Sequence, residues 1–460
     1  MIKLYDTLRG EIRPLETRHA GKVAFYACGP TVYDHPHLGH ARQASTYDIL
    51  RRYLEWRGLD VHHVANVTDI DDNIINRAQR EGLTEPEVAE KWEAIYFEAM
   101  DALGLLQPHD RPHATDFIDE MVDFIAVLLD RGVAYTTDSG VYLRVTAIDD
   151  YGALVHRTHD ELREGAGARV EVDEAKEDPL DFALWKAAKP GEPTWPSPWG
   201  EGRPGWHIEC VAMALGILGD DFDIHGGGDD LVFPHHTNER AEALAAGRPF
   251  ARHWVHNAML NVGGEKMSKS LGNFSTIADL LGEHPLNGRA FRLLVLQTHY
   301  RKTMELNPEI MRQAREGIER LDAMARKATS MGVGLDAEER DAEVIDGFRA
   351  VMDDDLATPE GVAIVFKTVR RANTALDAGD EGAAALVATA VELAEALGLS
   401  FDSGESESAA DDDEIDALVQ ARSAARDRRD FAEADRLRDD LTARGVIVED
   451  TPAGAVWRRT

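Results

Sequence analysis

The tetrapeptide His37-Leu38-Gly39-His40 is the first place along the chain where residue types and spacing indicate chemistry. It follows an apolar run ending in Gly29-Pro30 and precedes a segment with helical spacing, so a strand gives way to a helix here. A helix N-terminus offers unpaired N–H groups and partial positive charge, Gly39 allows close approach of a nucleotide, and both imidazoles can donate to phosphate oxygens. We therefore expect a phosphate site with His37 and His40 in catalytic roles. Helix-capping and surface histidines are the alternative for this tetrapeptide taken alone.

A second candidate is the run Lys266-Met267-Ser268-Lys269-Ser270, which follows Gly263-Gly264. Two lysines and two hydroxyls on a loop can close over a triphosphate and neutralise the charge that develops at the α-phosphorus. We expect Lys266 and Lys269 to act on the reacting phosphates. Taken alone, the run is equally compatible with an ordinary polar loop.

Four further side chains have the chemistry of metal ligands: Cys28, Cys210, His235 and Glu239. His235 and Glu239 are four residues apart, so on a helix that starts near Pro234 they share one face. Two thiolates, an imidazole and a carboxylate suit Zn²⁺, and ligands from distant segments fit a catalytic site better than a zinc finger. The other interpretation is two buried, inert cysteines with an exposed histidine and glutamate.

The elements that must position these groups have the pattern of an α/β fold. Residues 22–33 form a predicted strand, residues 35–58 show helical spacing, and residues 60–70 form a second predicted strand. A strand, a helix and a strand in this order imply a parallel sheet whose ligand crevice lies at the carboxyl ends of its strands. We therefore predict a Rossmann-like, doubly wound parallel sheet as the catalytic domain.

The rest of the chain divides by composition. Residues 307–400 contain Ala-rich amphipathic segments that predict helices, and residues 401–416 hold eight acidic and no basic residues, as in a disordered linker. The expected division is a catalytic domain at 1–113 and 206–255, an inserted subdomain at 114–205, a lysine-loop region at 256–306, an α-helical bundle at 307–400, an acidic linker at 401–416 and a small C-terminal domain at 417–460.

Charge and composition exclude several classes of function. The 460 residues include 84 acidic and 50 basic ones, a net charge of −34, which argues against indiscriminate binding to nucleic acid or anionic membranes. The chain has no run of about 20 apolar residues, no apolar signal core and only two cysteines, so we expect a cytoplasmic protein with no membrane partner. Lysine is scarce, 11 residues against 39 arginines, and the acidic excess suggests a salt-rich cytoplasm.

Taken together, the motifs resemble the cysteinyl-tRNA synthetases, a family of class I aminoacyl-tRNA synthetases. HLGH in the first strand-to-helix turn and KMSKS after the later strands form the double signature of that class, and the resemblance covers essentially the whole chain. The stretches that carry it are CGPTVYDHPHLGHAR, NVTDIDDNII, DPLDFALWK, GRPGWHIEC, DIHGGGDDLVFPHHTNE, KMSKSLGNF, HYR at 299–301, and the tail from RRDFAEADRLRDDL to VEDTPAGAVWRR.

The resemblance implies a role for each site residue. The four candidate ligands would hold a zinc ion that binds the substrate thiolate, because shape alone discriminates poorly between cysteine and serine. The substrate side chain would lie among Gly29, Thr31, Thr68 and Trp206, although Trp206 also fits a plain core position. ATP would contact Pro30, Gly39, His40, Gly226, Gly227, Gly228, Asp229 and Lys269, although a glycine run before Asp also fits a turn.

The implied reaction has two steps. L-cysteine and ATP, with Mg²⁺ on the triphosphate, give cysteinyl-adenylate and pyrophosphate, and tRNA(Cys) then accepts the cysteinyl group. His37, His40 and Lys269 would stabilise the transition state, residues 256–306 would contact the tRNA stem, and residues 417–460 would recognise the anticodon. A monomer is expected.

The sequence departs from the family pattern at Thr237, where Glu is usual, and at Asn73, where Lys is usual; neither is a proposed ligand. Two rival functions share some of the motifs. The related cysteine ligase of mycothiol synthesis carries both signatures and the zinc site but lacks a C-terminal RNA-binding module, which this chain has as a tail expected to be helical and ending in AVWRRT. A non-catalytic paralogue that binds only tRNA or zinc is disfavoured by the intact signatures.

Overall fold

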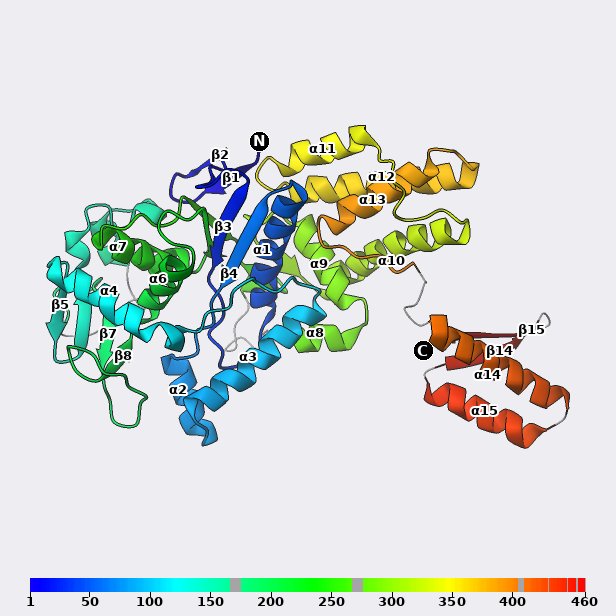
Figure 1. The fold of residues 1–460 in the computed structure, drawn as a ribbon, viewed down its shortest axis with the longest axis horizontal. Coiled ribbons are helices and arrows are strands. Elements are labelled where there is room, and N and C mark those ends of the chain that lie inside the picture. Colours follow the sequence, from blue (N-terminus) through cyan, green and yellow to red (C-terminus); the bar gives the residue numbers. More distant parts are fainter. Residues whose placement is uncertain are drawn as a thin grey trace.

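The computed structural model describes residues 1–165, 175–266, 276–403, 409–428, 430–444, 446–451 and 454–459. Its centre is a four-stranded sheet in the order β10-β9-β3-β4, formed by β3 (Lys22–Ala27), β4 (Asp60–Ala65), β9 (Ile224–Gly228) and β10 (His253–Asn257). All three pairings are parallel. Helix α1 (Leu38–Trp56) connects β3 to β4 and lies across the sheet (Figure 1). The predicted Rossmann-like α/β class is confirmed.

The sheet is covered on both faces, which fits its composition. Every residue of β9 and β10 is buried. The glycines of β9 allow close packing: a Cβ on Gly226 would lie 2.5 Å from the Tyr47 ring, and one on Gly227 would lie 2.6 Å from the His236 ring. The Tyr47 hydroxyl donates to the carbonyl of Gly227 at 2.6 Å, so α1 is fastened directly to this glycine strand.

After β4 come α2 (Asp72–Glu81) and α3 (Glu85–Ala102), and the chain then enters the predicted insertion. That region contains α4 (Ile118–Asp130), α5 (His159–Gly165) and an antiparallel sheet in the order β5-β6-β7-β8, with its short 3₁₀ turns between them. The strands are β5 (Ala134–Thr137), β6 (Gly140–Leu143), β7 (Phe182–Ala187) and β8 (Gly202–Pro204). Helix α6 (Trp206–Ile217) returns the chain to β9.

Beyond β9, a wide helical turn at Val232–His236 leads into α7 (Thr237–Ala245). After β10, a small sheet in the order β12-β11-β13 combines β11 (Leu260–Val262), β12 (Glu265–Lys266) and β13 (Met304–Leu306), with α8 (Ile277–Glu283) and α9 (Asn287–Gln297) between β12 and β13. An N-terminal hairpin of β1 (Lys3–Asp6) and β2 (Glu11–Pro14) packs beside β10.

The predicted helical segment contains α10 (Pro308–Ser330), α11 (Ala342–Met352), α12 (Thr358–Ala378) and α13 (Ala383–Glu395). One apolar core is continuous from the sheet through α1 and α9 into these helices, and includes Leu50, Phe291, Leu321, Phe348 and Val365. The bundle is therefore packed against the catalytic body rather than tethered to it. No helix among the described residues is both long and apolar enough to cross a bilayer.

The C-terminal module differs from its prediction in two respects. Helix α14 (Ala409–Asp427) begins inside the predicted linker 401–416, because acidic residues near a helix N-terminus are favoured by the helix dipole. The AVWRRT end is not helical: β14 (Val446–Thr451) and β15 (Gly454–Arg459) form an antiparallel hairpin beside α14 and α15 (Phe431–Ala443). Figure 1 shows this module at the end of the molecule opposite the insertion.

Candidate functional site

The four predicted metal ligands converge at the carboxyl end of the central sheet. Cys28 directly follows β3, Cys210 lies in α6, His235 lies in the turn before α7, and Glu239 lies in the first turn of α7. The Sγ atoms of Cys28 and Cys210 are 3.7 Å apart, and Cys28 Sγ lies 3.6 Å from Glu239 Oε1. His235 Nε2 lies 3.5 Å from Cys210 Sγ and 3.1 Å from Glu239 Oε1. All four are buried, so the interpretation with an exposed histidine and glutamate does not hold.

A second set of potential ligands overlaps the first. Cys28 and Glu239 are shared with His225 on β9 and with His236, and in each set the ligand atoms lie within 4.8 Å of one another. His225 Nε2 contacts Glu239 Oε2 at 2.7 Å, and His236 Nε2 lies 3.3 Å from Cys28 Sγ. Neither histidine was among the metal ligands predicted from the sequence.

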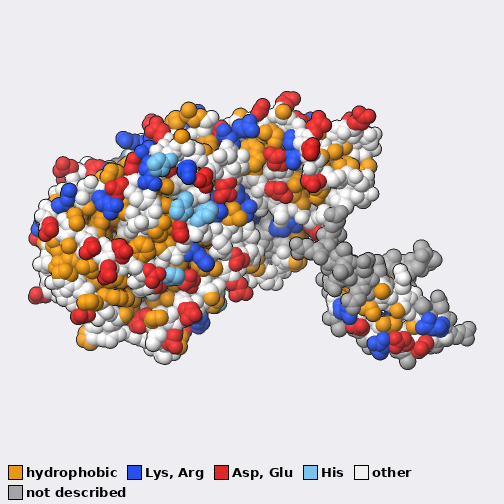
Figure 2. Space-filling model, viewed as in Figure 1, with side chains coloured by type: hydrophobic (Ala, Val, Ile, Leu, Met, Phe, Trp, Pro, Cys, Tyr) orange, Lys and Arg blue, Asp and Glu red, His pale blue; other side chains and the backbone are white. Residues whose placement is uncertain are grey.

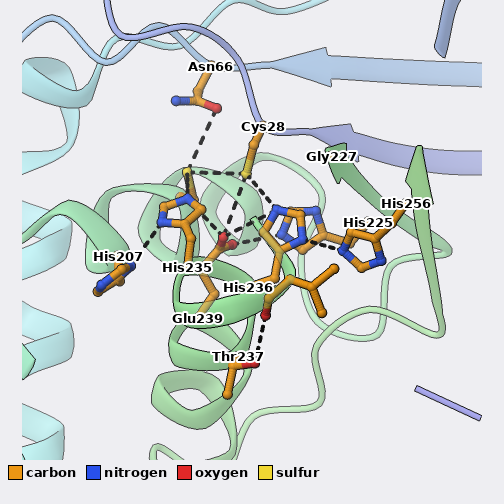
Figure 3. Close-up of polar contacts among 12 residues, drawn as sticks. Cys28, Asn66, His207, His225, Gly227, His235, His236, Thr237, Glu239 and His256 are labelled. Carbon is orange, nitrogen blue, oxygen red and sulfur yellow. Dashed lines mark hydrogen bonds and ion pairs between the residues drawn. The ribbon is translucent and has the colours of Figure 1, made fainter. Parts of the chain in front are cut away.

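Figure 3 shows that each member of the predicted set has a polar neighbour on its outer side. His236 lies beside Cys28, His225 beside Glu239, His207 Nδ1 is 2.9 Å from His235 Nδ1, and Asn66 Oδ1 is 3.8 Å from Cys210 Sγ. Such partners orient metal ligands and fix imidazole tautomers. Further out, His236 Nδ1 contacts His256 Nε2 at 2.7 Å, and His256 Nδ1 contacts Thr7 Oγ1 at 2.7 Å.

Burial sets the protonation of these groups. Burial, together with the neighbouring thiol of Cys210 and carboxylate of Glu239, raises the pKa of Cys28 well above its ordinary value. The hydrogen bond from Cys28 favours the Cys210 thiolate, but burial and nearby carboxylates still raise the Cys210 pKa. Burial and neighbouring histidines lower the pKa of His235 and of His236. The protein alone therefore holds protonated thiols and neutral imidazoles, which a divalent cation converts into a ligand set by displacing thiol protons.

The HLGH element lies where predicted, at the N-terminus of α1. The His37 side chain caps the helix by accepting from Gly39 N at 3.0 Å, and His37 N donates to His40 Nδ1 at 3.3 Å. The two imidazoles stack with 3.7 Å between centroids. Burial and the neighbouring His37 lower the pKa of His40 to about 3, so His40 is neutral at physiological pH.

A cavity of about 400 Å³ opens in front of this helix end. Its lining includes residues predicted for the HLGH element, for ATP binding and for the substrate side chain: Gly29, Pro30, Thr31, His37, Gly39, His40 and Trp206. Trp206 is 38% exposed and stacks on His235 with 4.1 Å between centroids, so it is not a core residue. The indole therefore lies between the cavity and the buried ligand cluster.

Other predicted residues lie elsewhere. Thr68 pairs with Thr31 in an isolated β-bridge but is buried, and its hydroxyl donates to Glu209 at 3.0 Å instead of lining the cavity. Gly226 and Gly227 pack against Tyr47 and His236, and their neighbour Gly228 is the glycine that reaches the cavity.

Asp229 lines a separate hollow of about 340 Å³ beside Thr7 and Phe233. Lys269 lies outside the described residues. Of Lys266, only its backbone in β12 is described.

The two departures from the family pattern serve the local backbone. The Thr237 hydroxyl donates to the carbonyl of Val232 at 2.7 Å, across the turn that presents His235 and His236 (Figure 3). Asn73 donates from its backbone and side chain to Asp71 Oδ1 at 2.7 and 2.8 Å, at the start of α2. Neither residue contacts the candidate ligands in these interactions.

The chain is similar in sequence to known proteins along its length. The profile of the class I (C) tRNA synthetase catalytic domain matches residues 14–316, the DALR domain matches 347–402, and the cysteinyl-tRNA ligase anticodon binding domain matches 411–458. The chain is 44% identical to a cysteine–tRNA ligase of Geobacillus thermodenitrificans (100% of this chain, 99% of the relative) and 47% identical to one of Alkalilimnicola ehrlichii (100% of both).

A solved structure shows the same fold at greater distance. Mycobacterium tuberculosis methionyl-tRNA synthetase in complex with methionyl-adenylate superposes with a TM-score of 0.60 at 15% identity, over 82% of this chain and 89% of that one. The two matches in sequence cover the whole length of the chain. The chain thus belongs to the cysteine–tRNA ligases, a family of class I aminoacyl-tRNA synthetases.

Proposed function

We propose that this enzyme activates L-cysteine with ATP and transfers the cysteinyl group to the 3′ end of tRNA(Cys), acting as a cytoplasmic monomer. The observation that carries the proposal is the juxtaposition of two features across Trp206: a buried cluster with thiol-binding chemistry and a helix N-terminus with phosphate-binding chemistry. A substrate whose two ends are a thiol and a carboxylate fits this juxtaposition. The carboxylate would face the α-phosphate of an ATP held at α1.

The residues at the buried cluster fit Zn²⁺. The cluster provides four donor atoms that lie close together: the sulfurs of Cys28 and Cys210, a nitrogen of His235 and an oxygen of Glu239. Such borderline-soft donors favour zinc over Mg²⁺ or Ca²⁺. A zinc ion held by these four residues would supply an affinity for the substrate thiolate over serine, whose hydroxyl is a poor ligand and is not ionised at neutral pH. His225 and His236 then act on Glu239 and Cys28 as orienting partners.

Phosphate chemistry falls to the signature residues. In the first step a cysteine carboxylate oxygen bonds to the α-phosphorus and the bond to pyrophosphate breaks, so negative charge builds on the phosphoryl oxygens. The partial positive charge at the N-terminus of α1, the His37 and His40 imidazoles, and the Lys266 and Lys269 ammonium groups would stabilise that charge, while Mg²⁺ accompanies the triphosphate. Pro30, Gly39 and Gly228 would border the adenosine side of the cavity.

Transfer to RNA needs local positive charge on an acidic protein. The C-terminal domain, proposed to extend over residues 417–460, contains arginines that would supply this charge, but two of them pair within their own helix: Arg436 with Glu433, and Arg438 with Asp435. Figure 2 shows basic and acidic side chains side by side on the coloured part of the module. We therefore assign the anticodon contact to the module as a whole rather than to its paired arginines.

One experiment tests the reaction and its rivals together. Cysteine-dependent ATP–pyrophosphate exchange, measured alongside zinc content and cysteinylation of tRNA(Cys), should give exchange, about one zinc per chain and charged tRNA. Exchange followed by transfer of cysteine to an amino-sugar inositol, and not to tRNA, would instead indicate the mycothiol ligase. No exchange at all would indicate a non-catalytic paralogue.

A further inference from the structure

Residues 299–301 join three parts of the molecule, and the proposed function gives them no role. The segment follows α9 and precedes β13, which pairs in parallel with β11. Strand β11 in turn pairs with β12, which ends at Lys266. The Tyr300 carbonyl also accepts from Ala258 N at 2.8 Å, just beyond β10. The position of 299–301 therefore sets the sheet that precedes the second signature.

The same segment holds the helix of the first signature through a buried arginine. Arg42 lies two residues after His40 and is 1% exposed. Its guanidinium donates to the carbonyls of Val295 and His299, both at 3.2 Å, and to that of Tyr300 at 3.4 Å. Within the described part of the chain these hydrogen-bond partners are carbonyls and not carboxylates, and burial lowers the pKa of Arg42 to about 10. Burying a cation whose partners are carbonyls costs free energy. We therefore explain this contact by its effect on the position of α1 rather than by a gain in stability.

The side chains of the segment converge on Asp355, which lies between α11 and α12 and is 2% exposed. Arg301 Nε donates to Asp355 Oδ2 at 2.7 Å, and the Tyr300 hydroxyl donates to Oδ1. Tyr5 N, in β1, donates to Oδ1 at 2.7 Å, and Asp355 N donates to the carbonyl of Lys3 at 3.0 Å. One carboxylate thus binds the bundle, the segment and the N-terminal hairpin.

The hairpin leads to the other half of the site. Two residues after Tyr5, the Thr7 hydroxyl contacts His256, which contacts His236, which lies beside Cys28. From Asp355, one path therefore runs through Arg42 to the phosphate-facing helix, and another runs through β1 to the thiol-facing cluster.

The backbone at this point is held under strain. Asp355 has φ of 60° and Leu356 has φ of 49°, two consecutive non-glycine residues in the left-handed region. Such conformations are unfavourable for residues with a side chain and persist where surrounding contacts impose them. Here those contacts are the ones made by the Asp355 carboxylate.

We propose that Asp355 is a positioning residue for the aminoacylation reaction, which fixes the two halves of the active site relative to each other and to the helical bundle. This inference rests on the proposed function. It assigns Asp355 no contact with substrate; the residue acts through Arg42 and Thr7, and its loss should misplace reacting groups that are still bound.

The test compares three full-length, zinc-loaded variants with the wild type by cysteine-dependent exchange, zinc content and thermal unfolding. Asp355→Asn should lower the exchange kcat roughly tenfold or more, with KM for ATP and cysteine and the zinc content nearly unchanged. Arg42→Lys, which keeps the charge but loses the fork across the carbonyls, should lower kcat in the same manner. Because both act on one connection, the double variant should be less impaired than the product of the single effects.

The matched control is Asp322→Asn, which removes another buried carboxylate of the bundle, paired with Arg289 at 2.6 and 2.9 Å. It should lower the unfolding temperature and leave kcat within about twofold of the wild type. The inference falls if Asp355→Asn lowers kcat no more than this control, or if the two single effects multiply. If Asp355→Asn does not fold, Arg42→Lys decides, since an unchanged kcat in that variant overturns the proposal. Failure of the wild type to exchange would instead overturn the proposed function.

Discussion

The pKa shifts in the buried cluster favour protonated thiols, whereas metal binding needs thiolates, and a bound cation would stabilise the thiolates. Two thiols with raised pKa values and two imidazoles with lowered ones are all uncharged around the Glu239 carboxylate. Two thiolates beside a carboxylate repel one another without a cation, which explains why the protein alone keeps the thiols protonated. Metal binding should therefore release protons and weaken as pH falls.

Cys210→Ser provides the most direct test of that cluster. Loss of one sulfur ligand should release zinc and raise KM for cysteine at least tenfold more than KM for ATP, since only the thiol end of the substrate depends on the metal. Metal analysis and exchange kinetics measure the two effects. Equal increases in both KM values would show that the cluster does not select the thiol.

His207 offers a test of the outer partners. Its Nδ1 contacts Nδ1 of His235, so His207→Ala should leave His235 free to rotate and weaken zinc binding about 10- to 100-fold. His207→Asn places an amide nitrogen near the same position and should restore much of the affinity. Competition with a chromogenic chelator measures both variants. Equal affinities for wild type and His207→Ala would leave His207 only a packing role.

Among the elements, α1 has the most demanding position, because it presents the signature and also crosses from the sheet to the bundle. Asp48, in the middle of α1, is 3% exposed and its Oδ2 accepts from Arg292 on α9. Burial acts to raise the pKa of Asp48, but Arg292 and Arg52 together hold it below its ordinary value. The ion pair thus fastens α1 to α9 within the common core.

Asp48→Asn should lower the free energy of unfolding at neutral pH by about 3–5 kcal/mol, because it leaves Arg292 buried without its partner. The folded-state pKa of Asp48 lies below that of the unfolded chain, so its contribution is complete above the unfolded value of about 3.9 and is lost as pH falls through the folded value. Urea unfolding at neutral and acidic pH should show the two proteins converging in acid. A constant difference would contradict the assignment.

The pattern of elements explains what could be predicted from sequence. Periodicity places the β3-α1-β4 unit, and ligand chemistry indicates Cys28, Cys210, His235 and Glu239, because the chain has only two cysteines and a spacing of four residues puts His235 and Glu239 on one helix face. His225 and His236 were not predicted. The pairing of parallel strands brings His225 to the cluster and the wide turn brings His236 there, and neither position can be read from residue spacing. Gly226 and Gly227 have the composition of a nucleotide turn, but the ring of Tyr47 and the imidazole of His236 occupy the space beside them.

At the scale of the whole molecule, the C-terminal module is separable. Its own core of Ile415, Val419, Leu441 and Val446 is distinct from the main core. Ending the chain at Ser403 should leave exchange nearly intact and lower aminoacylation at limiting tRNA roughly tenfold or more, as RNA contacts are lost. Normal charging by the truncated enzyme would move the anticodon contact to the bundle.

The net charge of −34 predicts an unusual response to salt. Acidic side chains are scattered over the face shown in Figure 2, and their mutual repulsion is screened within about 3 Å at 1 M ionic strength. The unfolding temperature should therefore rise between dilute buffer and molar potassium chloride, by about 1 °C for each kcal/mol gained in a chain of this length. Calorimetry measures this, and maximal stability in dilute buffer would exclude adaptation to salt.

The strand order β10-β9-β3-β4 also has a consequence for synthesis of the chain. Strand β3 cannot pair with β9 until β9 has been synthesised, and Cys28 precedes Glu239 by 211 residues. At ~5–20 residues per second, a ribosome takes about 10–40 s between the two. During that interval the nascent chain carries Cys28 without the other members of the buried cluster and a sheet edge without its neighbour, so the cluster can assemble only after β9 and α7 have emerged.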